Sequence, residues 1–344
     1  VPLQVVMDDV QPVPRLWLAS VESSALEPRN GKMQRYIQHR VALSYVDETI
    51  DINDLGFLSR NDNVQAEYTY SRNESNIEGL RSRSSSFQLI NQWNISGQPT
   101  RLGLFFNRNY TFLDNTTLRT GIRYFNPRID DRLGRGSGEF RIPERWAANI
   151  GWSSDPGRPL SYGFNLDGNQ EDLGKKIVTT SVDMSYRPVD SFSLGMEVSY
   201  ADREALLVYK GNGRYTSFEG SQWSPKVTMD YFISAKQQLR FSMQWTGIKA
   251  FEDRFYQVNA SKLESLNETG DVTAGSDNFA VSRMSFQARY RWEIAPLSDL
   301  FFVYTRGGNL ARNFEDDYGG MFEHAWNDQI VDNWVVKLRY RLGS

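Results

Sequence analysis

Apolar and polar residues alternate with a period of two along most of this 344-residue chain. At the C-terminal end, large apolar residues at every second position from Trp334 to Leu342 alternate with a set that includes Lys337 and Arg339. A period of two separates these sets onto the two faces of a β-strand, whereas a helix would scatter both around its circumference. The pattern predicts amphipathic strands, most clearly at Gln238–Thr246, Ser282–Trp292 and Asn333–Leu342.

Further runs of the same alternation predict eleven more strands, near residues 39–47, 63–73, 84–95, 100–112, 116–126, 145–153, 159–168, 176–187, 190–201, 224–233 and 298–306. The predicted total is fourteen strands, with sixteen as the alternative. The alternative depends on residues 206–218, where Gly211-Asn212-Gly213 is a hairpin signal. We interpret this segment as a hairpin that rises beyond the other strands, and two additional strands as the second interpretation.

The connections between the predicted strands alternate in length. Five are short: Leu113–Asn115, Ser154–Arg158, Pro188–Val189, Ser234–Gln237 and Ile294–Ser298. Four are long: Asn126–Glu144, Asp202–Gln222, Ala250–Phe279 and Gly307–Gln329. Bacterial outer-membrane barrels have short periplasmic turns and longer external loops. The alternation therefore predicts an all-β, transmembrane antiparallel β-barrel over residues 39–344, with Ser96–Thr100 as a short connection where a long one is expected.

The N-terminal residues 1–38 are predicted to form a separate segment. Leu16–Val21 predicts either one extra strand or a periplasmic or lumenal stretch, followed by a turn near Glu27–Lys32. The chain starts with Val1-Pro2-Leu3 and has no basic and apolar leader, so we expect a processed or truncated N-terminus.

Composition is compatible with a barrel. Mean hydropathy is −0.55, no long apolar run is present, and yet 13% of the residues are aromatic. We therefore expect no membrane-spanning helix, which needs about 20 apolar residues. Aromatic residues such as Trp146 and Trp152, which bracket one strand, are typical of the interfacial girdles of barrels. A water-soluble β-sandwich or propeller is the alternative.

Little in the chain indicates catalysis or a cofactor. There is no cysteine, and the two histidines are His39 and His324. No Gly-x-Ser-x-Gly nucleophile motif is present, so we expect no enzyme, no cofactor and no metal site, with a Ser-His-Asp triad left as an alternative. The acidic pairs Asp130-Asp131 and Asp316-Asp317 are interpreted as solvated loop residues, or alternatively as divalent-ion bridges to lipopolysaccharide.

One face of the predicted strands is strongly basic, although the net charge of the chain is −3. The strand registers place thirteen basic residues inward against five acids, which are Glu67, Asp183, Glu197, Asp230 and Asp299. A cationic lumen attracts anions, so the selectivity candidates are Arg101, Arg119, Arg123, Arg240, Arg283, Arg289, Arg291, Lys337, Arg339 and Arg341; the other three inward bases are Arg40, Arg187 and Lys226. The alternative is that these side chains pair with acids of infolded loops. Arg108 falls on the apolar face of its strand.

The segment Ile50–Asp62, chiefly Asn53-Asp54-Leu55-Gly56-Phe57, resembles the signature of an uncharacterised bacterial family. Members of that family carry an N-terminal module like family-9 carbohydrate-binding domains, followed by a long barrel-like region. The resemblance implies that this chain corresponds to the C-terminal, barrel-like part. It carries over no catalytic residues.

These observations favour two functions in the outer membrane of a Gram-negative bacterium. The first is a channel or uptake barrel for small anionic or sugar-like solutes. The second is a structural, assembly or receptor component with a filled lumen, whose long loops bind a partner protein or a surface glycan. In either case the expected partners are outer-membrane lipid and lipopolysaccharide, with a partner protein in an outer-membrane complex as a further candidate. The charge balance gives no reason to expect nucleic-acid binding.

Overall fold

The computed structural model describes residues 16–29, 33–50, 60–259, 264–271, 277–312 and 316–341. Within these ranges one antiparallel sheet contains sixteen strands: β1 (Leu16–Arg29), β2 (Met33–Val46), β3 (Asn63–Ile77), β4 (Leu80–Trp93), β5 (Pro99–Phe112), β6 (Thr117–Phe125), β9 (Arg145–Ser153), β10 (Leu160–Gln170), β11 (Lys176–Val189), β12 (Phe192–Gly211), β13 (Arg214–Ser234), β14 (Gln237–Gln257), β15 (Asn267–Asp271), β16 (Phe279–Ala295), β17 (Ser298–Arg312) and β18 (Val331–Arg339). A small separate hairpin consists of β7 (Arg128–Asp130) and β8 (Phe140–Ile142), and the helix α1 is Tyr318–Asn327.

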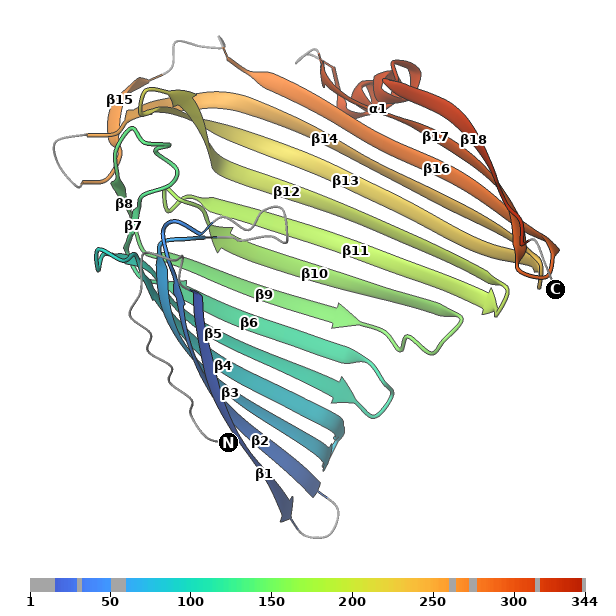
Figure 1. Cartoon of the computed structure of the whole chain (residues 1–344), viewed down its shortest axis with the longest axis horizontal. Helices are drawn as coiled ribbons and strands as arrows, with labels where there is room; N and C mark the ends of the chain where they lie inside the picture. The colour runs from blue at the N-terminus through green and yellow to red at the C-terminus, as the bar shows by residue number, and fades with distance from the viewer. Residues whose placement is uncertain are drawn as a thin grey trace.

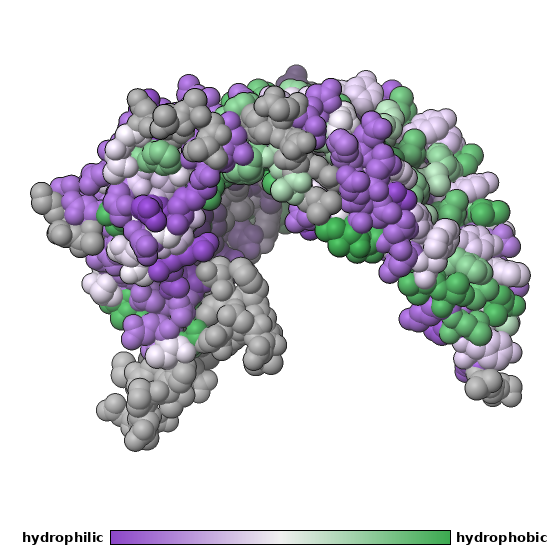
Figure 2. Space-filling view, turned by 90° about the horizontal axis from the view of Figure 1, so that it is seen from above, coloured by the Kyte–Doolittle hydropathy of each residue, from purple (hydrophilic) through white to green (hydrophobic). Residues whose placement is uncertain are grey.

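The strands follow one another in chain order and form a strongly curved sheet (Figure 1). Fifteen strands lie along the path from β1 to β18, and β15 pairs only with the end of β14. Seen from above, the sheet is an arch that is hollowed on one side (Figure 2). Among the described strands, β1 pairs only with β2 and β18 only with β17. The all-β fold with a large antiparallel sheet is therefore confirmed, whereas closure into a barrel stays a prediction.

All fourteen predicted segments form strands of this sheet, and the ambiguous segment Leu16–Val21 lies in β1. The path therefore has one strand more than predicted. The alternative of two additional strands at residues 206–218 was wrong, because this segment continues β12 and β13 without interruption. The domain boundary predicted after residue 38 falls inside β2, so β1 and β2 belong to the same sheet as the rest. Residues 51–59 of the signature segment lie outside the described residues.

The turns explain why the strands reverse where they do. Asn212 and Gly213 both have positive φ, of 51° and 72°, which is the backbone that a two-residue Asn-Gly hairpin needs. At the opposite end of the sheet, two residues join β11 to β12, β13 to β14 and β16 to β17. The predicted long connections 126–144, 250–279 and 307–329 lie at the other end of the sheet, but the predicted long connection Asp202–Gln222 was wrong, because β12 and β13 extend through it and only residues 212–213 join them. Residues 94–98 and 171–175 are also short connections at this long-loop end.

The two faces of the sheet differ in polarity, as the alternation predicts. On one face Phe164, Val182 and Val198 are register neighbours across β10, β11 and β12, and all three are exposed. On the other face Asp183, Glu197 and Lys226 are register neighbours across β11, β12 and β13. We call these the apolar face and the polar face. Polar-face residues such as Arg240 and Arg289 line a cavity, so the polar face is hollowed there.

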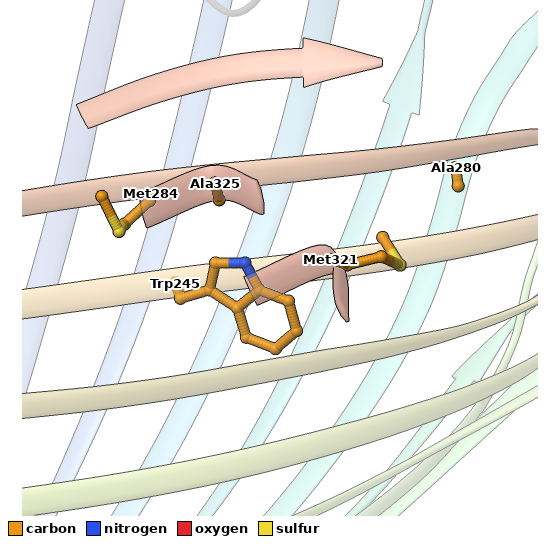
Figure 3. Packing of buried hydrophobic residues seen from close by; sticks show 5 residues of the cluster. All are labelled: Trp245, Ala280, Met284, Met321 and Ala325. Carbon is orange, nitrogen blue, oxygen red and sulfur yellow. The ribbon is translucent and has the colours of Figure 1, made fainter. Parts of the chain in front are cut away.

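Helix α1 packs on the apolar face near the long-loop ends of β14, β16 and β17. Its buried residues Met321 and Ala325 contact Trp245 of β14 and Met284 of β16 (Figure 3). The indole Nε1 of Trp245 donates to Ser282 Oγ at 2.8 Å, so that the polar atom of this buried ring is satisfied. The sequence pattern predicted only an external loop in this region. The helix was missed because its apolar contacts come from strands distant in the sequence.

The β7–β8 hairpin packs against the extended ends of β12, β13 and β14. Phe140 and Ile142 of β8 form a buried cluster with Tyr215 and Val258. Figure 1 shows this hairpin at the long-loop end of the sheet, beside the β12–β13 extension. The connection between β6 and β9 is thus folded against the protein itself. This packing forms a second buried apolar cluster at the long-loop end of the sheet, in addition to the cluster under α1.

A candidate anion-binding surface on the polar face

Nine of the ten selectivity candidates lie on strands in positions that belong to the polar face, and the tenth, Arg341, lies two residues beyond the end of β18. The registers align Arg240 with Arg289 across β14 and β16, and Arg291 with Phe301 across β16 and β17. Arg108 lies on the apolar face, as its position in the alternation indicated, where it donates to Ser85 Oγ. The alternation therefore assigned the faces of these strands correctly.

Three of these basic residues are paired with acids of the same face. The carboxylate of Asp299, whose side chain is 2% exposed, accepts hydrogen bonds from Arg291 and Arg339. Arg240 Nε donates to Asp230 Oδ2 at 2.8 Å. These pairs join neighbouring strands, so the alternative interpretation of the arginines as structural partners of acids holds for Arg240, Arg291 and Arg339. The acids come from the strands themselves and not from infolded loops.

Five other selectivity candidates have no acidic partner among the described residues. Within the part of the chain that the structure describes, no ion pair is made by Arg119, Arg123, Arg283, Arg289 or Lys337. Arg289 lines a cavity of about 430 Å³ on the polar face, together with Ser193, Asp230, Arg240 and Gln287. Cations that face a hollow surface without a counter-charge attract anions from solution.

A second cavity, of about 380 Å³, contains another candidate, Arg101. It is lined by Arg60, Gln92, Thr100, Arg101, Phe125, Arg128 and Arg145, near the long-loop ends of β4, β5, β6 and β9. Of its four arginines, only Arg101 was predicted from the sequence. Arg145 follows the alternation of β9 and was identifiable from it, whereas Arg60 and Arg128 lie at the ends of connections, where the pattern gives no signal.

Loop acids hold three of these arginines in place. Arg60 makes two hydrogen bonds to the carboxylate of Asp131, one of them 3.0 Å long, and Arg145 donates to Asp172 at 2.7 Å. Arg128 Nη2 lies 3.2 Å from Asp130 Oδ2. Burial by itself would raise the pKa of Asp131, but the hydrogen bonds and the charge of Arg60 keep that pKa below its ordinary value. The acidic pair Asp130-Asp131 is therefore an internal partner of arginines and not a solvated loop pair.

No metal site is visible in the described ranges, where no group of three His, Asp or Glu side chains is placed to hold an ion. His39 lies in β2 and its Nδ1 is 2.9 Å from Tyr68 Oη, while His324 lies on α1 beside Asp328. In the same part of the chain, no helix has the length and hydropathy to cross a bilayer.

The chain is therefore an all-β protein with one large, curved antiparallel sheet, one face of which is apolar and the other polar. A family model described as a domain of unknown function, DUF5916, matches residues 22–343. The chain belongs to this family. Among curated proteins none matches the chain.

Two solved structures are distantly similar. One is the siderophore receptor PirA from Acinetobacter baumannii, with 9% identity, a TM-score of 0.42 and coverage of 94% of this chain and 63% of that one. The other is the FrpB iron transporter from Neisseria meningitidis (F5-1 variant), with 12% identity, a TM-score of 0.47 and coverage of 87% and 53%. The chain thus spans less than two thirds of either protein. At this distance the matches assign neither a location nor a solute to this chain.

Proposed function

We propose that this chain forms a wall of an outer-membrane β-barrel that admits small anionic or sugar-like solutes. The observation that carries the proposal is the contrast between the faces. The apolar face exposes large side chains along most strands, and on the polar face Arg119, Arg123, Arg283, Arg289 and Lys337 make no ion pair within the described ranges. Lipid would cover the first face and water the second, which is the arrangement of a barrel wall.

Aromatic side chains support the membrane orientation of the apolar face. Trp146 and Trp152 lie six residues apart at the two ends of the apolar side of β9, and each contacts a tyrosine of a neighbouring strand. Trp and Tyr favour the membrane–water interface because their rings are amphipathic. The short turns would lie in the periplasm and the long connections outside the cell, in a Gram-negative outer membrane with phospholipid and lipopolysaccharide as neighbours.

A membrane location also requires that the open edges of β1 and β18 be paired, since backbone groups exposed to lipid have no hydrogen-bond partner. Fifteen strands with antiparallel neighbours leave β1 and β18 running in the same direction. Bacterial barrels usually contain an even number of antiparallel strands. We therefore propose that an odd number of additional strands completes the wall.

The second candidate is a receptor or assembly component with a filled lumen that binds a partner protein or glycan. The observation in its favour is the β7–β8 hairpin, which is folded against the protein rather than extended into solvent.

Conductance of the purified protein in planar bilayers distinguishes the two candidates. For a channel we expect stepwise conductance with a preference for chloride over potassium, and for small organic anions in liposome swelling. Fractionation of cells should recover the protein in the outer membrane and in need of detergent. A folded, membrane-inserted protein that conducts nothing would support the receptor, and a protein that is soluble without detergent would exclude both.

A further inference from the structure

The cavity beside Arg101 contains more hydrogen-bond donors than acceptors. Within the described ranges Arg101 makes no hydrogen bond or ion pair, and its guanidinium lies 5.6 Å and 5.8 Å from the ring centroids of Phe105 and Phe125. A guanidinium has five N–H donors and no acceptor. The neighbouring Thr100 Oγ1 and the Nε atoms of Arg60, Arg128 and Arg145 are buried without a hydrogen-bond partner. Buried donors in native proteins normally have an acceptor.

The charges around the cavity also remain unbalanced. Asp130, Asp131 and Asp172 contact Arg128, Arg60 and Arg145, so that three acids face three of the four arginines. Glu67 is close enough to act on Arg101 electrostatically, but it forms no ion pair with it and accepts hydrogen bonds from Gln65, Thr69 and Gln88. Among the described residues around this cavity, Arg101 is therefore the arginine that has no direct counter-ion.

The shape of the site leaves one side of Arg101 accessible. Gly103, the next polar-face residue of β5, leaves room for the ring of Phe105, because a Cβ there would lie 2.7 Å from Phe105 Cε2. The Phe105 and Phe125 rings pack edge to face and support the guanidinium from one side. The other side faces the cavity of about 380 Å³. This volume is near the lower limit for small-molecule sites, which are about 300–1,000 Å³.

We infer that this cavity binds a small polar solute through an oxyanion group, either a carboxylate or a phosphate, held by Arg101. Planar guanidinium groups bind both groups through paired hydrogen bonds. Gln92 and Thr100, which also line the cavity, are suited to hydroxyl groups of the same molecule. The site lies at the long-loop end of the sheet, where a solute from outside would first reach the polar face. The role of this site in solute uptake rests on the proposed function. Binding of the solute itself does not require an open pore.

The test is calorimetric titration of the purified full chain in detergent with glucuronate, glucose 6-phosphate and glucose. We expect measurable binding of at least one of the two anions, and binding of glucose at least tenfold weaker. The substitution Arg101→Gln removes the charge and should weaken anion binding at least tenfold. The matched control is Arg119→Gln, which removes an arginine of the same face that does not line this cavity. It should change binding less than twofold.

The two anions distinguish the sources of the oxyanion. Tighter binding of glucuronate assigns the site to carboxylates, and tighter binding of glucose 6-phosphate assigns it to phosphates. Absence of binding of both anions, equal loss in Arg101→Gln and Arg119→Gln, or no loss in either would overturn the inference. Circular dichroism of both variants shows whether a loss comes from unfolding, and Arg101→Lys, which keeps the charge but not the paired donors, gives a second measurement if Arg101→Gln does not fold. Anion binding without conductance would contradict the proposed channel while supporting the site.

Discussion

The carboxylate of Asp299 in β17 accepts a 2.8 Å hydrogen bond from Arg291 Nε in β16. Arg339 of β18 donates to the second oxygen of the same carboxylate, so one acid joins three strands at the short-turn end of the sheet. Its side chain is almost fully buried, whereas both arginines are partly exposed. The cluster therefore contributes to the association of the last strands, and its two arginines are already neutralised in part.

The first prediction concerns this cluster. Asp299→Asn removes the charge that holds Arg291 and Arg339 and should lower the free energy of unfolding by about 1.5–3 kcal/mol, the range for loss of a hydrogen bond to a charged group. The measurement is the midpoint of denaturant unfolding in detergent. Asp183→Asn is the control, because Asp183 lies on the same face without a hydrogen bond to its carboxylate in the described ranges. An equal loss of stability in the two variants would contradict a special role for Asp299.

A second prediction separates selectivity from stability. Replacing Arg283, Arg289 and Lys337 by Gln should reduce anion preference in bilayers several-fold and leave unfolding unchanged, because these side chains make no ion pair within the part of the chain that the structure describes. Replacing Arg291 and Arg339 by Gln should mainly destabilise the protein. The anion preference of the unmodified protein should decrease toward 1 M salt, where screening acts within about 3 Å. If only the variant with Arg291 and Arg339 replaced changed its anion preference, the assignment of selectivity to the other three residues would be wrong.

The pH dependence of the long connection between β6 and β9 follows from Asp131. Its pKa in the folded protein is lower than the ordinary value of 3.8, so the charged form stabilises the contact with Arg60. This stabilisation is complete above the ordinary pKa and is lost as the pH falls through the lower, folded-state pKa. Limited proteolysis of this connection should therefore accelerate only below about pH 4. Asp131→Asn should be cleaved faster than the unmodified chain at pH 7, and its cleavage should not accelerate on acidification.

The packing of α1 is testable by labelling, since the chain contains no native cysteine. A cysteine at Ala325, which is buried against the sheet, should react slowly with a maleimide, and one at the exposed Glu323 should react rapidly. Met321→Asp should expose the first site and raise its rate at least tenfold, because a charge cannot be buried against Trp245 and Met284. Equal rates for Ala325→Cys and Glu323→Cys would show that the helix does not pack as described.

Orientation in the membrane is tested with two further cysteines. Gly319→Cys lies on α1 at the long-loop end and Val189→Cys at a two-residue turn. On intact cells an impermeant reagent should label the first and not the second. Val189→Cys should become accessible after the outer membrane is permeabilised. The opposite pattern would invert the proposed topology.

Much of this fold was predictable from the sequence because strand alternation is local. A residue of a pleated strand points to the face opposite its neighbour whatever the rest of the chain does. The apolar and polar faces, the fourteen segments and the position of Arg108 on the apolar face all followed from this period. The path has one strand more than the fourteen predicted because Leu16–Arg29 forms β1, where the alternation left an extra strand and a periplasmic or lumenal stretch both open.

The tertiary structure alone decided which charges meet. Arg60 and Asp131 are 71 positions apart, and Arg339 and Asp299 are 40 apart, so that each pair depends on strand order and register. The same holds for α1, whose apolar residues become buried only against Trp245 and Met284. The sequence by itself determined two faces and a basic excess on one of them. Which of those basic residues are neutralised, and which remain available to an anion, was decided by contacts between distant strands and loops, because no local period carries that information.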